Sequence, residues 1–339
     1  MLTPELMQEG HSESPSSCAT LRLQDARVCD MDLPYRKSIY PLGYSVEIVT
    51  NEPAVLAAAE QSFGHVRSSR QTTPLQIRVG VTHQERAILP PEPERHAFAH
   101  LFSLVADAHN QSLLDLNTGQ NFTWITRTTL ENCLYFRTNF LEKAVYLLLG
   151  ASVVTDLHAA CVSRNDRGIL LCGRSGAGKS TLAYACARQG WTYTSDDTSY
   201  LINSAVNPRV IGHCHRARFR PEARSLFPEL ADRAITPRME CKPSIEVPIA
   251  DLPVGSATPE AEIHAIVFLD RHPDGVCRFL RLRRGTATER MRHELYSTGE
   301  IRARHEETLE IFSDIPAFEL QYCKLNDGIE ALESLISRI

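Results

Sequence analysis

The feature that most restricts the fold of this chain is a glycine-rich segment between an apolar run and a helix-forming run. The segment Gly173–Ser180 reads Gly-Arg-Ser-Gly-Ala-Gly-Lys-Ser and matches G-x-x-x-x-G-K-[ST] at every fixed position. Ile169–Cys172 precedes it with strand character, and Thr181–Gln189 follows with helix character before Gly190. A strand, a glycine-rich loop and a helix in this order predict an α/β domain with a P-loop.

The chemistry of this loop favours a bound triphosphate. Glycines let the backbone N–H groups turn toward an anion at the positive end of the following helix. Lys179 would bridge the β and γ phosphates, and the Ser180 hydroxyl would ligate magnesium. The alternative, a glycine-rich turn that binds nothing, fits poorly with a strand and a helix on either side. ATP and Mg²⁺ are therefore the expected cofactors, and the expected nucleotide-binding residues are Gly173, Arg174, Ser175, Gly176, Ala177, Gly178, Lys179, Ser180 and Thr181.

A histidine is expected beside the loop. Leu157–Val162 has a strand pattern, and the turn sequence at 165–168 predicts a hairpin between His158–Ser163 and Ile169–Cys172. The hairpin places His158 close to Gly173, next to the phosphates. A hydrogen-bonded strand histidine without chemistry is the alternative.

Two adjacent carboxylates follow the next predicted strand, Trp191–Ser195. In a strand-helix-strand unit the parallel strands end at the same sheet edge, so Asp196 and Asp197 should face the triphosphate. One can accept a proton from an attacking hydroxyl and the other can hold magnesium. A turn that caps the next segment is the other interpretation. Asp270, at the end of the apolar run 265–269, is the alternative magnesium ligand, although a buried core strand explains that run as well.

Three segments are expected along the chain. Residues 1–38 are polar and lack a periodic apolar face, which predicts a poorly ordered N-terminal segment. Residues 39–150 predict a smaller α+β domain, with an antiparallel meander after an early strand and helix. Residues 151–339 alternate strand and helix patterns and predict the α/β catalytic domain.

Composition excludes several classes of function. The net charge of −5 argues against nucleic acid as a partner, and no apolar stretch is long enough for a membrane span. Met1–Ser17 lacks the basic start and apolar run of a secretory signal, and the dispersed cysteines include no C-x-x-C pair. These features predict a cytoplasmic protein with reduced thiols.

His158, the P-loop and the Ser195-Asp196-Asp197 step together resemble the catalytic domain of HPr kinase/phosphorylase, most clearly over Asp156–Leu201. The resemblance extends to the wider HPr kinase-like group, which includes serine kinases of lasso-peptide clusters. It implies a phosphoenolpyruvate-carboxykinase-like fold and a protein or peptide acceptor with a serine. It is also compatible with a homo-oligomer.

The resemblance also implies roles for single residues. Asp196 would be the catalytic base, His158 its partner, Lys179 a phosphate ligand in the catalytic set, and Asp197 an acid on the magnesium. The chain departs from the family at Arg174 and Thr181, where Asp and Glu are usual, and it lacks a Glu-Ile-Arg-Gly-Leu-Gly-type signature. These departures leave two questions undecided: which acceptor is phosphorylated, and whether the reverse, phosphorylase reaction occurs.

An arginine-rich segment at 206–227 replaces the missing signature. Arg216, Arg218 and Arg220 could clamp the γ-phosphate or an acidic acceptor, because guanidinium pairs with phosphate and carboxylate; a solvated basic surface is the alternative. The triplet 213–215, His-Cys-His, is a poor zinc site without distant partners.

The leading hypothesis is an ATP- and magnesium-dependent kinase that phosphorylates a serine of a protein or peptide. The alternatives are a nucleotide-binding regulatory protein, and a P-loop ATPase or small-molecule kinase that uses Asp270.

Overall fold

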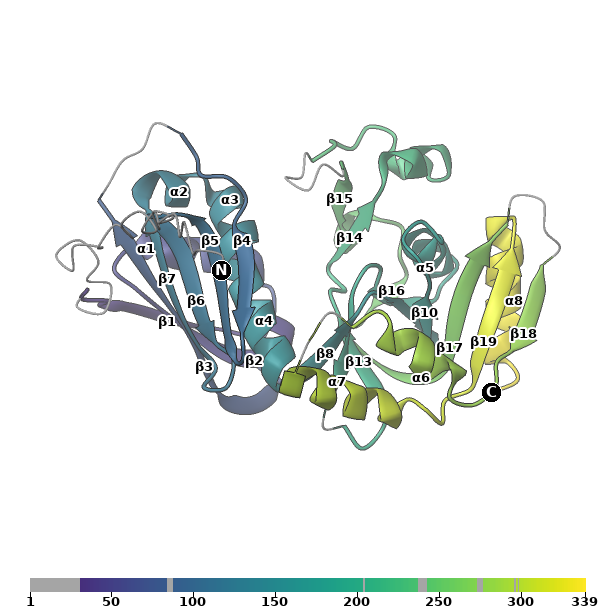
Figure 1. The fold of residues 1–339 in the computed structure, drawn as a ribbon. Helices are drawn as coiled ribbons and strands as arrows, with labels where there is room; N and C mark the ends of the chain where they lie inside the picture. The colour runs from purple at the N-terminus through teal and green to yellow at the C-terminus, as the bar shows by residue number, and fades with distance from the viewer. Residues whose placement is uncertain are drawn as a thin grey trace, which may run out of the picture.

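The structure, a computed structural model, describes residues 31–83, 88–203, 205–236, 243–272, 277–295, 297 and 299–339. It is a mixed α/β protein with several sheets, as the sequence predicts. Figure 1 shows two units side by side: a first unit from β1 to α4, and a second unit from β8 to α8. The expected poorly ordered segment falls mostly on residues 1–30, which lie outside the described residues.

The first unit is built on a mixed sheet. Among the described residues it has seven strands in the order β1-β2-β3-β7-β6-β5-β4; β5 to β7 form the predicted antiparallel meander, and β4 extends it. β2 and β3 alternate apolar and polar residues, which buries one face of the sheet. The strands are β1 (Tyr35–Ile39), β2 (Tyr44–Thr50), β3 (Arg70–Thr82), β4 (Glu94–Phe98), β5 (Leu101–Asp107), β6 (Asn110–Asp115) and β7 (Gln120–Thr126).

Helices cover the apolar face of this sheet. Pro53 begins the first main helix, where its fixed φ is compatible with a helix start. Buried residues of α1, α3 and α4 pack with the buried residues of β2 and β3 in one core. The helices are α1 (Pro53–Phe63), α2 (Arg127–Glu131), α3 (Cys133–Phe136) and α4 (Glu142–Ser152), with a short turn η1 (Pro41–Gly43) and a π-helical turn η2 (Arg137–Leu141).

The second unit contains the P-loop in the middle of a larger sheet. Over the described residues this sheet has ten strands, with the path β16-β11-β9-β10-β17-β13-β12-β8, while β19 pairs with β17 and β18. The strands are β8 (Val154–Leu157), β9 (Ala160–Arg164), β10 (Arg167–Cys172), β11 (Thr192–Ser195), β12 (Ser199–Ile202), β13 (Arg209–Gly212), β16 (Ser256–Ala257), β17 (Glu260–Arg271), β18 (Arg278–Arg281) and β19 (Ala317–Tyr322).

Helices cover both faces of β10 and β17. Ile169, Leu171 and Val267 face a core with α5 and α8, whereas Leu170 and Ile266 face a core with α6 and α7. The helices are α5 (Lys179–Arg188), α6 (Thr286–Arg292), α7 (Gly299–Ile311) and α8 (Leu325–Ile336). A separate ribbon of β14 (Arg216–Phe219) and β15 (Ile245–Pro248), with the short turns η3 (Pro221–Ser225), η4 (Pro228–Leu230) and η5 (Ile249–Asp251), stands beside α5.

The two units share a core. The cluster under the first sheet continues through Val154, Tyr200, Ile202 and Ile211 of the second unit. His305 Nε2 of α7 also donates to the Gly150 carbonyl at 2.7 Å. A division of the chain at residue 150 therefore falls inside α4 and inside continuous packing.

Two expectations about elements are wrong in detail. Tyr35–Ile39 pairs with β2, so the ordered chain begins before residue 38. The predicted strand Leu157–Val162 is two strands, β8 and β9, which join different parts of the sheet. Between them the Ala159 N–H donates to the Leu157 carbonyl at 2.8 Å, so the chain turns at His158. Within the described ranges, no helix is long and apolar enough to cross a membrane.

Candidate active site

The P-loop has the backbone conformation that its glycines predict. Gly176 and Gly178 have φ of 89° and 95°, a region where a side chain is strained. A Cβ at Gly178 would lie 2.6 Å from the hydroxyl of Tyr322, which donates to the Ala177 carbonyl at 3.3 Å. The loop is thus held against the end of β19, and the first turn of α5 starts directly behind it.

Lys179 lies inside this loop with 5% of its surface exposed. Its Nζ donates to the Gly173 carbonyl at 2.6 Å and to the Arg174 carbonyl at 3.4 Å. Burial lowers the pKa of the ammonium, whereas the Cys172 and Asp197 side chains raise it. The Lys179 ammonium is therefore desolvated and donates to backbone carbonyls. A phosphate would be a stronger hydrogen-bond partner for it than a carbonyl.

The carboxylate pair lies beside the P-loop, as the sheet topology predicts. β9 separates β10 from β11 and is antiparallel to both, so β10 and β11 end at the same edge. The Ser180 hydroxyl donates to the Asp196 carbonyl at 2.9 Å. Helix α5 and the end of β11 are therefore joined at the point where a γ-phosphate would sit.

Asp196 is a buried acid with 6% of its surface exposed. Its Oδ2 accepts a hydrogen bond from the Arg218 backbone N–H at 2.8 Å. Burial, together with the charge of the neighbouring Asp197, raises the pKa of Asp196 to about 6, while the Arg218 N–H opposes the rise. A carboxyl with this pKa is ionised at neutral pH and still basic enough to accept a proton.

Asp197 lies at the surface between two cationic or polar partners. His158 Nδ1 is 3.4 Å from Asp197 Oδ1, and Arg218 Nη1 is 3.6 Å from Oδ2. His158 lies in the turn between β8 and β9 and contacts Asp197, the second acid of the pair. Burial and the charge of Lys179 lower the pKa of His158, so the imidazole is neutral at pH 7.

The arginines of the 206–227 segment alternate along β14. Ala217 and Phe219 face the core, where Phe219 contacts Tyr184 of α5. The arginines therefore point the other way. Arg218 reaches Asp197, and Arg220 Nη2 donates to the Ser175 hydroxyl of the P-loop at 3.0 Å.

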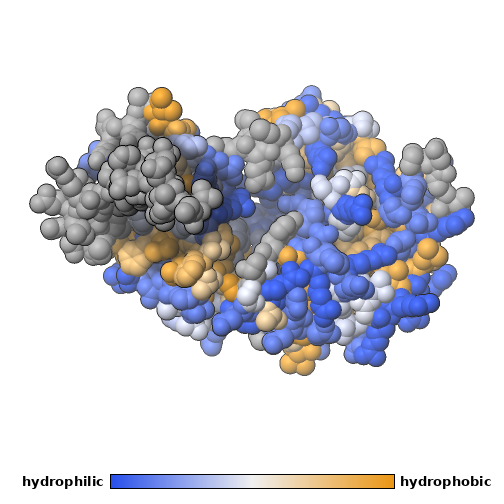
Figure 2. Space-filling view, in the orientation of Figure 1, coloured by the Kyte–Doolittle hydropathy of each residue, from blue (hydrophilic) through white to orange (hydrophobic). Residues whose placement is uncertain are grey.

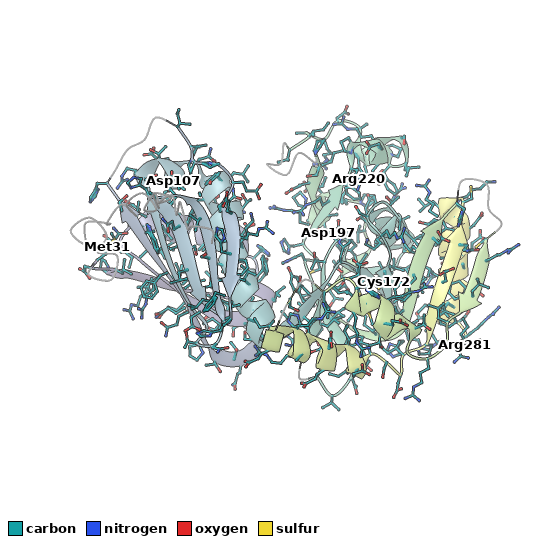
Figure 3. All side chains as sticks on the ribbon, in the orientation of Figure 1. Met31, Asp107, Cys172, Asp197, Arg220 and Arg281 are labelled. Carbon is teal, nitrogen blue, oxygen red and sulfur yellow. The ribbon has the colours of Figure 1, made fainter. Side chains whose placement is uncertain are left out.

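Arg216 Nη1 lies 3.4 Å from Glu246 of β15, and Arg218 Nε lies at the same distance from this carboxylate. Figure 3 shows Asp197 and Arg220 on the side of the second unit that faces the first. Two of the three predicted arginines thus contact predicted site residues directly.

Asp270 has a different environment. Its Oδ2 lies 2.8 Å from His272 Nε2 and accepts from the Gln321 side-chain amide at 3.2 Å. It shares the face of β17 with Phe268, toward α6 and α7, whereas α5 packs on the opposite face. The recorded contacts of this carboxylate are thus with β17 and β19 neighbours, whereas Ser180 contacts Asp196.

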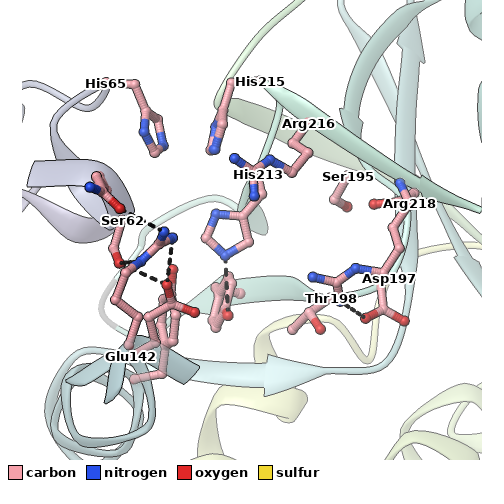
Figure 4. Close-up of a pocket in the computed structure, with 15 residues that line it drawn as sticks. Ser62, His65, Glu142, Ser195, Asp197, Thr198, His213, His215, Arg216 and Arg218 are labelled. Carbon is pink, nitrogen blue, oxygen red and sulfur yellow. Dashed lines mark hydrogen bonds and ion pairs between the residues drawn. The ribbon is translucent and has the colours of Figure 1, made fainter. Parts of the chain in front are cut away.

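A cavity of about 220 Å³ opens onto the carboxylate pair from the first unit. Figure 4 shows it between α1, α4 and the β13–β14 segment, and Figure 2 shows a hydrophilic hollow between the units. Asp196, Asp197 and Arg218 line one side, and the opposite side is formed by Gln61, Ser62, His65, Arg137, Glu142 and Tyr146. These first-unit residues carry no motif, so the sequence did not single them out.

Polar contacts fix the walls of this cavity. Arg137 donates to Ser62 at 2.7 Å and to Glu142 at 3.1 Å. His65 and His215 lie with ring centroids 3.5 Å apart across the two units, as Figure 4 shows. Burial lowers the pKa of both rings, that of His215 to about 3, so both are neutral at pH 7. His215, the last residue of the His-Cys-His triplet, thus forms a ring contact between the two units.

The residues present fit a triphosphate with magnesium. The P-loop offers the buried ammonium of Lys179, and a Cβ at Gly176 would meet no atom within 4 Å, so the loop leaves open space at that glycine. The Ser180 hydroxyl and the half-exposed Asp197 carboxylate are hard oxygen donors of the kind that magnesium prefers.

Comparison with known proteins supports a distant relationship to one enzyme family. The chain is 29% identical over 118 residues to the HPr kinase/phosphorylase of Chlorobaculum tepidum. The match covers 32% of this chain and 33% of the relative, so the chain spans about a third of the length of the curated relative it matches. No family model matches the chain. The likeness suggests an enzyme of the kinase/phosphorylase type.

Proposed function

We propose that this protein is an ATP- and magnesium-dependent kinase that transfers the γ-phosphoryl group to a serine hydroxyl of a protein or peptide. One observation carries the proposal: the backbone carbonyl of Asp196 accepts from the Ser180 hydroxyl at the P-loop, and the buried Asp196 carboxyl at the same time lines the cavity between the units. A protein that only binds or hydrolyses a nucleotide does not need a buried base directed at a second binding site.

Each residue then has one task. Lys179 binds the β and γ phosphates, and Arg220, next to Ser175, approaches them from the β14 side. Asp196 accepts the proton of the attacking hydroxyl. His158 and Arg218 position Asp197 through the two contacts described above. Magnesium bound by Ser180 and Asp197 would neutralise charge on the transferred group.

The cavity favours a polypeptide acceptor over a free metabolite. Small-molecule pockets span about 300–1,000 Å³ and enclose most of the ligand. The cavity here is smaller, about 220 Å³, and it is polar and open. It has room for one hydroxyl-bearing side chain, while the rest of the acceptor stays outside against α1 and the β13–β14 segment.

Label transfer tests this function. Purified protein is incubated with γ-labelled ATP, magnesium and an extract of the producing organism, and label is followed into protein and peptide. We expect an acid-stable labelled species, as for phosphoserine, that is absent when Asp196→Asn replaces the wild type. Release of free phosphate alone would indicate an ATPase, and nucleotide binding without turnover would indicate a regulatory protein.

The pKa of Asp196 predicts the pH dependence of transfer. Because the base form increases as pH rises through about 6, kcat/KM should rise about tenfold per pH unit below that value and level off above it. His158 also titrates in the acid range, so His158→Gln is the control, and it should keep the same acid limb. A profile that is flat from pH 5 to 8 would contradict proton acceptance by Asp196.

A further inference from the structure

The arginines of β14 form a row that leads from the P-loop into the cavity between the units. Ala217 and Phe219 face the core, so Arg216 and Arg218 point the opposite way. Arg220 follows with φ of −72° and ψ of 152°, which continues the extended conformation past the end of β14. The three arginines therefore share one face, with about 6.6 Å between successive Cα atoms of the row.

Each position in this row meets a different part of the site. Arg220 donates to the Ser175 hydroxyl of the P-loop at 3.0 Å. The Arg218 backbone N–H donates to the Asp196 carboxylate at 2.8 Å, which places this residue beside the proposed base. Arg216, two residues further from the P-loop, also lines the cavity, and in Figure 4 its side chain extends from β14 toward the first unit. The row thus passes from the phosphates to the base and then to the acceptor side.

Arg216 is the arginine of the cavity wall with donors available to a ligand. Arg137 uses Nε, Nη1 and Nη2 for contacts within the first unit. Arg218 lies directly across the ribbon from Glu246, which is therefore its cross-strand partner. Arg216 lies across from the uncharged Pro248, and among the described residues only its Nη1 has a partner, Glu246 at 3.4 Å. Because the Arg216 side chain is 47% exposed, its other N–H groups can meet a ligand.

The carboxylates of the cavity wall do not exclude an acidic ligand. Glu142 accepts from Arg137 at 3.1 Å, and Asp197 lies 3.6 Å from Arg218. Each of these two acids is therefore balanced by a cation of its own. The charge of Arg216 remains in the wall, and a guanidinium binds a carboxylate through two parallel hydrogen bonds.

We propose that Arg216 recognises an acidic residue of the acceptor, two positions away from the serine that is phosphorylated. The inference rests on the proposed function, because it places the serine hydroxyl at Asp196. Side chains two residues apart in an extended peptide lie on the same side, with the spacing that separates Arg216 from Arg218. A peptide that lies along β14 with its serine at Asp196 therefore brings an aspartate or glutamate at that position to Arg216. The acceptor class is an acidic, extended segment with a serine.

Short peptides with capped ends test this specificity, because their only carboxylate is the chosen side chain. Each peptide has one serine among alanines and glycines. Aspartate stands two residues before the serine in the first and two residues after it in the second, and the third has asparagine at both places. Fluorescence anisotropy measures their binding to the full chain with magnesium and a non-hydrolysable ATP analogue. We expect one acidic peptide to bind about tenfold more tightly than the asparagine peptide, as for a charge-assisted hydrogen bond.

Arg216→Gln should abolish this preference, so that the ratio of the two dissociation constants falls to about one. Arg216→Glu should reverse it, because a peptide with lysine at the same place then binds more tightly than the aspartate peptide. Arg233→Gln is the matched control. Arg233 Nη1 also lies 3.4 Å from a carboxylate, that of Asp251, and Arg233 is not one of the residues that line the cavity. This control should keep the tenfold ratio.

The outcomes separate the two proposals. Equal binding of all three peptides, or a preference that persists in Arg216→Gln, would overturn recognition by Arg216 and leave the kinase proposal standing. Transfer of label from γ-labelled ATP to the serine of the preferred peptide is measured in parallel. An acidic preference in binding without any labelled peptide would support the Arg216 site and contradict the proposed transfer to serine.

Discussion

Asp196→Asn should lower phosphoryl transfer by about a hundredfold or more while ATP affinity stays within about threefold, as expected for loss of a general base. The amide keeps the shape of the carboxyl and can still accept the Arg218 N–H. It cannot accept the proton of a hydroxyl. Single-turnover transfer from labelled ATP and calorimetric titration of ATP measure the two quantities separately.

The same substitution should not destabilise the fold. Burial raises the pKa of Asp196 from the ordinary value near 3.8 to about 6, so the folded protein holds this proton more tightly than the unfolded chain. The resulting stabilisation is complete below about pH 4 and is lost as pH rises to about 6. The neutral amide avoids the cost of the buried charge, so at pH 8 its free energy of unfolding should equal the wild-type value or exceed it by up to about 2–3 kcal/mol.

Asp270→Asn is the matched comparison, because it makes the same chemical change at the alternative carboxylate. We expect it to retain most of the transfer activity, since Asp270 contacts His272 and Gln321 on the other face of β17. The reverse pattern, in which Asp270→Asn is inactive and Asp196→Asn is active, would favour the ATPase or small-molecule kinase hypothesis.

Lys179→Ala should weaken binding of ATP by about tenfold to a hundredfold, the range for loss of a charge-assisted hydrogen bond. The ammonium is already desolvated and donates to the Gly173 and Arg174 carbonyls. Binding a phosphate therefore requires little further desolvation of Lys179. Tripolyphosphate binding should fall by a similar factor, because Lys179 acts on the phosphates.

Lys37→Ala is the control for Lys179→Ala, because Lys37 makes a surface ion pair with Glu60 in the first unit. It removes the same charge without touching the P-loop, and ATP affinity should not change. Wild-type affinity in Lys179→Ala would show that the triphosphate does not bind at this loop.

The sequence predicted the part of the site that depends on local pattern. The Asn165-Asp166 turn has positive φ at both residues, which centres the hairpin between them and gives the predicted register. The P-loop, α5 and the parallel end of β11 follow from the strand-helix-strand rule, and that rule alone brings Asp196 to Ser180. The roles of these residues in catalysis stay predictions.

Long-range packing decided what the sequence did not predict. The break at His158 depends on which strands β8 and β9 pair with, and those partners, β12 and β11, come later in the chain. His65 and Glu142 reach the cavity only because α1 and α4 pack against the second unit. No spacing or motif marks such residues, because their neighbours are distant in sequence.

The shared core has a consequence for how such a protein can be altered or diversify. Tyr200 follows the carboxylate pair by a few residues, lines the cavity, and stacks on Tyr146 of α4 with ring centroids 5.6 Å apart. A chimaera that takes its first unit from a relative must therefore also match this aromatic face, or Tyr200 loses its neighbour. Under the proposed function, the first-unit wall of the cavity and the carboxylate pair are therefore constrained to change together.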